Sequence, residues 1–458
     1  MAEQEAPPTA KEALYAGVRP TAVKILNRIE RSDSYLDKLL DVELRANDLT
    51  NADKGLLSEI VHGVIRWQGK LDWLLNRFTH GNFSKSEINV KNALRVALYQ
   101  ILYLDRLPHY AVVNEAVEFI KRIRGEKMAN LVNAVLRNIL RNLDNIRYPL
   151  AEEDILQHLT IVYSHPVWMV KRWLTRFSPA ELEKLLAANN EIPHLTLRIN
   201  KLKITPASFL AMLDEQSIPY QGSSYLDFFI RVKSLARITQ LEAFKLGYFS
   251  IQDESAALPV QLLSPQPGER IIDMCAAPGG KTTLLGEMMK NSGEIFAIDK
   301  YEHKLKMVKS SCERLGITNV QPVVGDSGEI DIPPAKKIIL DVPCSGLGVL
   351  RKKPDIKWRR QMENIDHLVV IQKQLLENAV KHLEPGGVLV YSTCTIEPEE
   401  NEMQIKSFLA NHPEFQIDDP SKFVNKSVTT PEGFIYTYPH RNQLDGSFAV
   451  RLVKSASA

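Results

Sequence analysis

Cysteine is scarce in this chain of 458 residues, which has four: Cys275, Cys312, Cys344 and Cys394. They form no CxxC pair and stand near no histidine pattern, which argues against a disulfide framework and a zinc site. We therefore expect free thiols and no bound metal.

Long apolar runs are missing as well. No run approaches the roughly 18–20 residues that a membrane-spanning helix needs. The first residues, MAEQEAPPTAKEAL, are acidic where a signal peptide would be basic and then apolar. Apolar residues make up 44% of the chain and charged residues 24%, which excludes disordered and fibrous classes. We expect a soluble cytoplasmic protein that does not bind membranes.

A strong net charge is also lacking, since the balance is only +2, so the whole chain does not indicate a polyanion partner. Between Lys54 and Arg141, however, 14 basic residues stand against 7 acidic ones. Such a segment is either a solvated face or an RNA-binding surface, and the sequence leaves both open.

A second basic cluster, RKKPDIKWRR, runs from Arg351 to Arg360. Here we favour nucleic acid over a solvated face, because cations around an aromatic ring suit single-stranded bases. The residues predicted to bind RNA are Arg351, Lys352, Lys353, Trp358, Arg359 and Arg360.

The apolar pattern divides the chain into three domains. Residues 1–148 show helical spacing, for instance at Leu57, Ile60 and Val64, and predict an all-α bundle. Residues 149–250 combine helical stretches with the alternating HLTLRINK and predict a small α+β domain. In residues 251–458, short apolar runs alternate with helical stretches, which predicts βαβ units and a parallel, Rossmann-like α/β sheet.

The first strand of that sheet runs into DMCAAPGGKTT, from Asp273 to Thr283. Ligands bind outside the carboxyl ends of such strands. A P-loop is one interpretation, but the first glycine that it requires falls on Cys275. The other is a nucleoside cofactor site, in which small residues keep the turn thin at a helix N-terminus. The second strand then ends in Asp299, where an acid can take both ribose hydroxyls, and the third ends in Asp326.

Two thiols follow the next two strands, Cys344 in KKIILDVPCSGLG and Cys394 in GVLVYSTCT. We expect them to face the cofactor cleft, whereas Cys312 on a helix is expected to be a small core residue and Cys275 a packing residue of the turn. A cofactor, an RNA-binding rim and two thiols indicate a thiolate that adds to an electron-poor ring. Methylation of a pyrimidine at C5 is such a reaction, since C5 attacks a methyl group only after a thiolate has added at C6.

Three motifs carry a resemblance to a known family. DMCAAPGGKTT, DVPCSGLG (341–348) and STCTIEPEENE (392–402) match, in order and spacing, the RNA cytosine-5 methyltransferases that use S-adenosylmethionine. The N-terminal part, with AVVNEAVEF (111–119) and LVNAVLRNIL (131–140), resembles the NusB-type RNA-binding helical domain. The fusion of the two resembles the bacterial enzymes of this family that act on 16S ribosomal RNA.

The resemblance implies roles for individual residues. Cys394 would be the nucleophile, Cys344 would assist removal of the C5 proton and product release, and Asp341 would contact the cofactor or the target cytosine. The substrate would be 16S ribosomal RNA, naked or partly assembled, and no obligate protein partner is implied. Ser447 departs from the family pattern at a position expected to be aromatic. The cofactor-binding set would be Cys275, Ala276, Ala277, Pro278, Gly279, Gly280, Lys281, Asp299, Asp326 and Asp341.

Three rival functions stay open on the sequence. One is a non-enzymatic RNA-binding factor with an inactive methyltransferase fold, against which both thiols and every cofactor acid are present. Another is an ATPase, suggested by GGKTT and IILD (338–341). The nearest is DNA cytosine methylation, but those enzymes place the nucleophile in a Pro-Cys motif, and the additional Cys394 favours the RNA family.

Overall fold

The computed structural model describes residues 14–32, 34–46, 49–79, 81–233, 235 and 238–456. The chain forms two compact units, one of residues 1–190 with 353–359, the other of residues 191–352 with 360–458. Among the residues that the structure describes, no helix is both long and apolar enough to cross a bilayer. The predicted limits of three domains stay predictions.

The first unit is helical, as the spacing of its apolar residues predicts. Its core holds the apolar sides of α2, α4, α6 and α8, and α6 is buried on nearly all sides. Thr50 caps α4, and Ser178 with Pro179 begins α11. The helices are α2 (Val18–Arg31), α3 (Leu36–Ala46), α4 (Asn51–Arg66), α5 (Gln68–Phe78), α6 (Ile88–Tyr103), α7 (His109–Arg124), α8 (Glu126–Arg141), α9 (Ile155–Val162), α10 (Val167–Trp173), α11 (Pro179–Asn189) and, from the later segment, α17 (Ile356–Arg359).

A small antiparallel sheet opens the second unit. Its strand order is β2-β3-β1-β4, and β1 (Leu195–Ile199) is the strand that HLTLRINK predicts. Phe209 of α12 lies in the same apolar core as Leu197 of this sheet, and its ring is 5.6 Å from the ring of Phe249 on β4. The other elements are α12 (Pro206–Glu215), β2 (Tyr220–Gly222), β3 (Phe229–Val232), α13 (Glu242–Lys245) and β4 (Phe249–Ile251).

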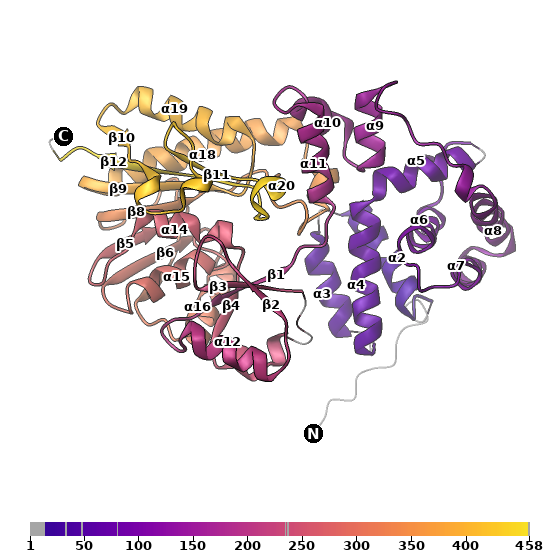
Figure 1. The fold of residues 1–458 in the computed structure, drawn as a ribbon, viewed down its shortest axis with the longest axis horizontal. Helices are drawn as coiled ribbons and strands as arrows, with labels where there is room; N and C mark the ends of the chain where they lie inside the picture. The colour runs from indigo at the N-terminus through magenta and orange to yellow at the C-terminus, as the bar shows by residue number, and fades with distance from the viewer. Residues whose placement is uncertain are drawn as a thin grey trace. The chain divides into compact units, whose positions relative to one another are not determined.

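The rest of the second unit is a large mixed sheet with the order β10-β12-β9-β8-β5-β6-β7, with β11 paired to β12 (Figure 1). Five neighbouring strands are parallel, and β10, β11 and β12 pair antiparallel. The strands are β5 (Arg270–Asp273), β6 (Glu294–Asp299), β7 (Val320–Val324), β8 (Ala335–Asp341), β9 (Leu383–Thr393), β10 (Phe415–Ile417), β11 (Phe434–Thr437) and β12 (Ser447–Lys454).

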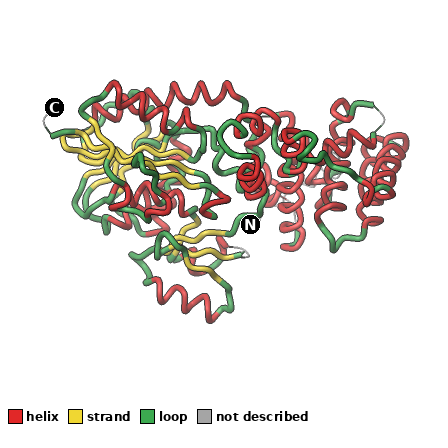
Figure 2. Tube along the Cα trace, turned by 45° about the horizontal axis from the view of Figure 1, so that its top comes forward, coloured by secondary structure: helices red, strands yellow, loops and turns green. Residues whose placement is uncertain are grey.

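Helices cover both faces of the large sheet, because alternate residues of its strands point to opposite sides. Ile271 of β5 packs in the core that includes α14 and α15, whereas Ile272 packs in the core that includes α18 and α19. Figure 2 shows helices on either side of the strands of this sheet. The helices are α14 (Leu258–Leu263), α15 (Gly280–Met288), α16 (Glu302–Leu315), α18 (Met362–His382), α19 (Glu402–Asn411) and the short α20 (Pro439–Asn442). The predicted fold class, a helical bundle, a small α+β part and a Rossmann-like sheet, is confirmed.

Ser447 begins β12, where an aromatic residue was expected. Its hydroxyl lies 2.7 Å from the hydroxyl of Thr437 on β11, and the next residue, Phe448, is fully buried. The strand is therefore complete without an aromatic ring at position 447.

The strand order fixes where a ligand can bind. From β5 the chain proceeds outward through β6 and β7, then returns to place β8 and β9 on the other side of β5. The crevice between the carboxyl ends of β5 and β8 is thus the switch point of the sheet, where ligands of doubly wound sheets bind.

Candidate active site

The turn from β5 into α15 is thin and closely packed. Gly279 has φ +106°, a left-handed conformation that favours glycine, and a Cβ there would stand 3.1 Å from Cα of Val308 on α16. Below the turn, Thr282 donates to Oδ2 of the buried Asp273 at 2.7 Å, while Oδ1 of Asp273 has no hydrogen-bond partner among the described residues. Burial raises the pKa of Asp273 to about 7. A thin turn over a buried acid at a helix N-terminus fits a nucleoside cofactor such as S-adenosylmethionine.

Two acids follow the next two strands. Asp299 is largely buried, and its Oδ1 accepts a hydrogen bond from the backbone N–H of Tyr301 at 3.0 Å. Asp326 is more exposed and accepts from the N–H of Gly328 at 3.0 Å and from Lys300 at 2.9 Å, and both contacts lower its pKa. Asp299 is therefore the acid better placed to hold ligand hydroxyls in a water-poor environment.

An ion pair crosses the switch point. Nζ of Lys281, at the start of α15, lies 2.6 Å from Oδ2 of Asp341 at the end of β8. Ser392 of β9 donates to Oδ1 of Asp341 at 2.8 Å. Although burial opposes its charge, the nearby Asp341 and Cys394 raise the pKa of Lys281. Lys281 therefore holds a positive charge inside the crevice, paired with Asp341, which is not the role of a P-loop lysine.

The two thiols that follow β8 and β9 lie against each other. The Sγ atoms of Cys344 and Cys394 are 3.1 Å apart, and the backbone N–H of Cys394 points to Sγ of Cys344 at 3.3 Å. None of the four cysteines forms a disulfide in the part of the chain that the structure describes, and Cys394 is the most exposed of them. Cys312 is buried on α16, as expected, and Cys275 packs partly against the core. The sequence separates Cys344 from Cys394 by 50 residues, and the sheet brings them together.

The loop that holds Cys344 packs closely on the chain around Cys394. Gly348 donates its N–H to the carbonyl of Cys394 at 3.1 Å and accepts from the N–H of Gly446 at 2.8 Å. A Cβ on Gly348 would stand 1.9 Å from the carbonyl oxygen of Gly446. Glycine at this position lets three backbone segments meet beside the thiols.

Glu400 is a buried acid near the thiols that the sequence analysis did not single out. Its Oε2 accepts from the backbone N–H of Ser345 at 2.8 Å, and its Oε1 accepts from the hydroxyl of Ser345. Nε2 of Gln372 on α18 donates to Glu400 at 3.0 Å. Glu400 lies in the quoted motif STCTIEPEENE, but an exposed acidic run and a buried carboxylate look alike in a sequence.

Part of the predicted RNA-binding cluster lies in the second unit. Arg351 and Lys352 form ion pairs with the buried Asp445, at 2.8 and 2.7 Å, and both also pair with Asp253. Nε of Arg360 donates to the carbonyl of Ser345 at 2.9 Å.

The rest of the cluster belongs to the helical unit. The Trp358 side chain donates to the carbonyl of Ile65 at 2.7 Å, and Arg359 donates to that of Ser34 at 2.7 Å. Lys353 is exposed. Lys357 is fully buried and donates to the carbonyls of Arg66 and Ser164 and to the side chain of Asn190. Most of these side chains thus have partners inside the protein, and their contact with RNA stays a prediction.

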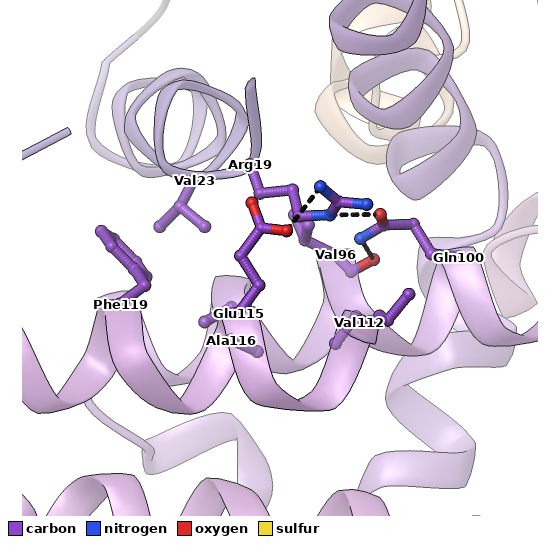
Figure 3. Close-up of a pocket in the computed structure, with 10 residues that line it drawn as sticks. Arg19, Val23, Val96, Gln100, Val112, Glu115, Ala116 and Phe119 are labelled. Atoms are coloured by element: carbon purple, nitrogen blue, oxygen red, sulfur yellow. Dashed lines mark hydrogen bonds and ion pairs between the residues drawn. The ribbon is translucent and has the colours of Figure 1, made fainter. Parts of the chain in front are cut away.

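A shallow pocket lies in the helical unit, away from the predicted site residues. Figure 3 shows Arg19 of α2 between Gln100 of α6 and Glu115 of α7, at 2.6 Å from each. Val23 and Phe119 supply apolar walls. Its polar side chains are paired with one another, so the pocket offers a ligand little to bind.

Three family models match the chain. Residues 17–141 match the NusB family, residues 165–239 match the ferredoxin-like domain of RsmF/B-like methyltransferases, and residues 260–453 match the 16S rRNA methyltransferase RsmB/F. The three matches follow the helical part, the segment around the small sheet and the large sheet in that order.

Relatives match along nearly their full length. A probable ribosomal RNA small subunit methyltransferase B of Synechocystis is 36% identical, over 95% of this chain and 99% of the relative. Ribosomal RNA small subunit methyltransferase B of Cronobacter sakazakii is 33% identical, over 93% of this chain and 96% of the relative. The crystal structure of PH0851 superposes with a TM-score of 0.79 at 28% identity, covering 95% of this chain and 99% of that chain.

Proposed function

We propose, from the premise that this chain belongs to the RsmB/F family of S-adenosylmethionine-dependent 16S rRNA methyltransferases, that it methylates C5 of a cytidine in 16S ribosomal RNA. The observation that carries the proposal is the pair of thiols, with Sγ atoms 3.1 Å apart, beside the switch point of the sheet. One thiol is enough to add to a pyrimidine ring. A second thiol in contact with the first can assist a later step, the removal of the C5 proton after methyl transfer.

Cys394 is the nucleophile in this proposal. It is the more exposed thiol, and the ammonium of Lys281 lies near enough to interact with its charge. The Cys394 thiolate forms a bond to C6 of cytosine. The electron pair of the C5=C6 bond shifts to C4–C5, and the pair of the C4=N3 bond shifts to the ring nitrogen N3, which takes up a proton from solvent. C5 then carries the electron density to attack a methyl group.

Cys344 acts after methyl transfer. The C5 proton must leave to a base, with the assistance of Cys344, so that its electron pair re-forms the C5=C6 bond and N3 gives up its added proton. The C6–S bond breaks as this double bond forms, and its electron pair leaves on the sulfur, so that Cys394 recovers its thiolate. The contact between the two sulfurs keeps Cys344 close to the site of this elimination.

Residues of the crevice would hold the cofactor. Bound S-adenosylmethionine supplies an electrophilic methyl group. The thin turn from Cys275 to Lys281 would lie against its nucleoside and amino acid parts, Asp299 would hold the ribose hydroxyls, and Asp326 and Asp341 would complete the site.

The substrate test compares ribosomal RNA from a deletion strain with RNA from its parent. Bisulfite sequencing should reveal one cytidine of 16S RNA that loses its C5 methyl group in the deletion strain and regains it when purified protein and S-adenosylmethionine are added. Naked RNA and partly assembled subunits serve as alternative substrates in the same assay. A deletion strain with an unchanged pattern of 5-methylcytosine would refute the proposal.

A further inference from the structure

Glu400 and Gln372 hold the chain on both sides of Cys344. Glu400 accepts from the N–H of Ser345, the residue after Cys344, at 2.8 Å. Gln372 donates to the carbonyl of Pro343, the residue before Cys344, at 3.0 Å, and the same Nε2 donates to Glu400 at 3.0 Å. Glu400 and Gln372 are both fully buried. The backbone of Cys344 is thus fixed by two side chains that themselves are bonded to each other.

Opposite charges lie near the two thiols. Lys281 interacts with Cys394, whereas the carboxylate of Glu400 interacts with Cys344. A nearby cation favours the thiolate form of a cysteine, and a nearby anion favours the protonated form. The two sulfurs therefore sit in different electrostatic environments although they are 3.1 Å apart.

We propose that Glu400 is a positioning residue that fixes Cys344 and keeps the proton of the thiol pair on Cys344, so that Cys394 is the sulfur that ionises. The proposal rests on the proposed function for the roles of the two thiols. Before addition the S–H bond of Cys394 breaks and its proton passes to solvent, while Cys344 keeps its S–H and donates it to the thiolate of Cys394.

Several groups around the two thiols raise the pKa of Cys344, and another lowers it. The hydrogen bond with Cys394, burial and the charges of Cys394 and Glu400 raise the pKa of Cys344, while the N–H of Cys394 opposes this shift. Asp341 lies beside Lys281 and weakens its effect. Glu397 also acts on Glu400, and Tyr391 donates to the carbonyl of Glu400 at 2.6 Å. Arg360 donates to the carbonyl of Ser345, the residue that Glu400 holds.

Glu400 itself titrates above the usual range of a glutamate, because burial raises its pKa. Its charge is present above that pKa and disappears as the pH falls through it. The difference between the pKa values of the two thiols should therefore grow as the pH rises through the pKa of Glu400.

The test is the alkylation rate of each cysteine against pH, measured with iodoacetamide on the full chain and resolved by peptide mass spectrometry. In the unaltered protein Cys394 should react at lower pH than Cys344. Glu400→Gln can still accept from Ser345 and lacks the charge, so Cys344 should react about 3- to 10-fold faster at pH 7.5. The rate of the buried Cys312 serves as an internal reference for unfolding.

Two further variants separate charge from position. Glu397→Gln removes another buried carboxylate of the same segment, and should change the alkylation rate of Cys344 less than twofold. Gln372→Met removes the contact to Pro343 without changing a charge, so it should lower kcat for RNA methylation and leave the order of alkylation unchanged.

The outcomes are distinct. An unchanged Cys344 profile in Glu400→Gln, a shift of equal size in Gln372→Met, or faster alkylation of Cys344 than of Cys394 in the unaltered protein each overturns the inference. Because alkylation needs neither RNA nor cofactor, a protein that fails to methylate RNA but shows the expected profiles would refute only the proposed function.

Discussion

Nζ of Lys281, in the helix that follows β5, lies 2.6 Å from Oδ2 of Asp341 at the end of β8, across the switch point of the sheet. The pair joins the turn that would hold the cofactor to the loop that leads to Cys344. Ser392 extends the connection to β9 and thereby to Cys394. Hydrogen bonds thus connect the turn proposed to bind the cofactor to the strand that leads to Cys394.

The buried Asp273 below this cluster predicts a pH dependence of stability. Its folded pKa of about 7 lies above the ordinary value of 3.8, so the folded protein binds the proton more tightly than the unfolded chain. Its contribution to the free energy of unfolding is therefore largest below about pH 4 and is lost as the pH rises to about 7. Between pH 5 and pH 8 the free energy of unfolding should fall by roughly 2–4 kcal/mol less in Asp273→Asn than in the unaltered protein, measured by urea unfolding. An equal change of the free energy of unfolding between these two pH values in the variant and in the unaltered protein would contradict the raised pKa of Asp273.

Asp299 makes a prediction about the cofactor. Asp299→Ala should weaken binding of S-adenosylmethionine by about 1–3 kcal/mol, because hydrogen bonds from ribose hydroxyls to a largely buried carboxylate would be lost. Calorimetric titration measures the change. Asp331→Ala, at an exposed aspartate after β7, is the matched control and should leave the affinity for S-adenosylmethionine unchanged. Both variants should bind RNA as the unaltered protein does. Unchanged cofactor affinity in Asp299→Ala would exclude the ribose role.

Lys352 and Lys353 are neighbours with different expected effects. Lys352→Ala breaks ion pairs with the buried Asp253 and Asp445 and should destabilise the protein by roughly 2–4 kcal/mol. Lys353→Ala should leave stability unchanged and reduce the slope of log affinity for RNA against log salt by about 0.7, the value for one lost phosphate contact on a single strand. If the slope does not change, Lys353 belongs to a solvated face.

Two glycines of α4 form a matched pair for stability. A Cβ on Gly63 would stand 1.9 Å from the ring of Tyr99, so Gly63→Ala should destabilise the helical unit by about 1–3 kcal/mol. Gly55 has nothing within 4 Å, and Gly55→Ala should stabilise the helix by about 0.5–1 kcal/mol. Thermal unfolding followed by circular dichroism measures both, and equal changes of Tm would contradict this packing.

The sequence predicted the fold because its signals are local. Each parallel strand contains a short apolar run with an acid or a thiol at its end or just beyond it, and alternation with helical stretches indicates the sheet. That Cys344 and Cys394 face one cleft also follows, since the carboxyl ends of parallel strands share an edge.

Long-range burial of charge was not predictable. Lys357 lies in a run of cations that suggests a surface, yet its three acceptors come from residues 66, 164 and 190. Arg351 and Lys352 find partners about 100 residues away in both directions. Glu400 likewise contacts Ser345 through the pairing of β8 with β9, which no local pattern encodes.

The most direct test of the proposed mechanism is the behaviour of the two cysteine variants with RNA and S-adenosylmethionine on a denaturing gel. Cys394→Ala should give neither methylated RNA nor a covalent complex, because no C6 adduct can form. Cys344→Ala should accumulate a protein–RNA adduct that survives denaturation, because addition and methyl transfer proceed while removal of the C5 proton is slow. The reverse pattern, an adduct in Cys394→Ala and none in Cys344→Ala, would contradict the assignment of roles, and no adduct in either variant would contradict covalent catalysis.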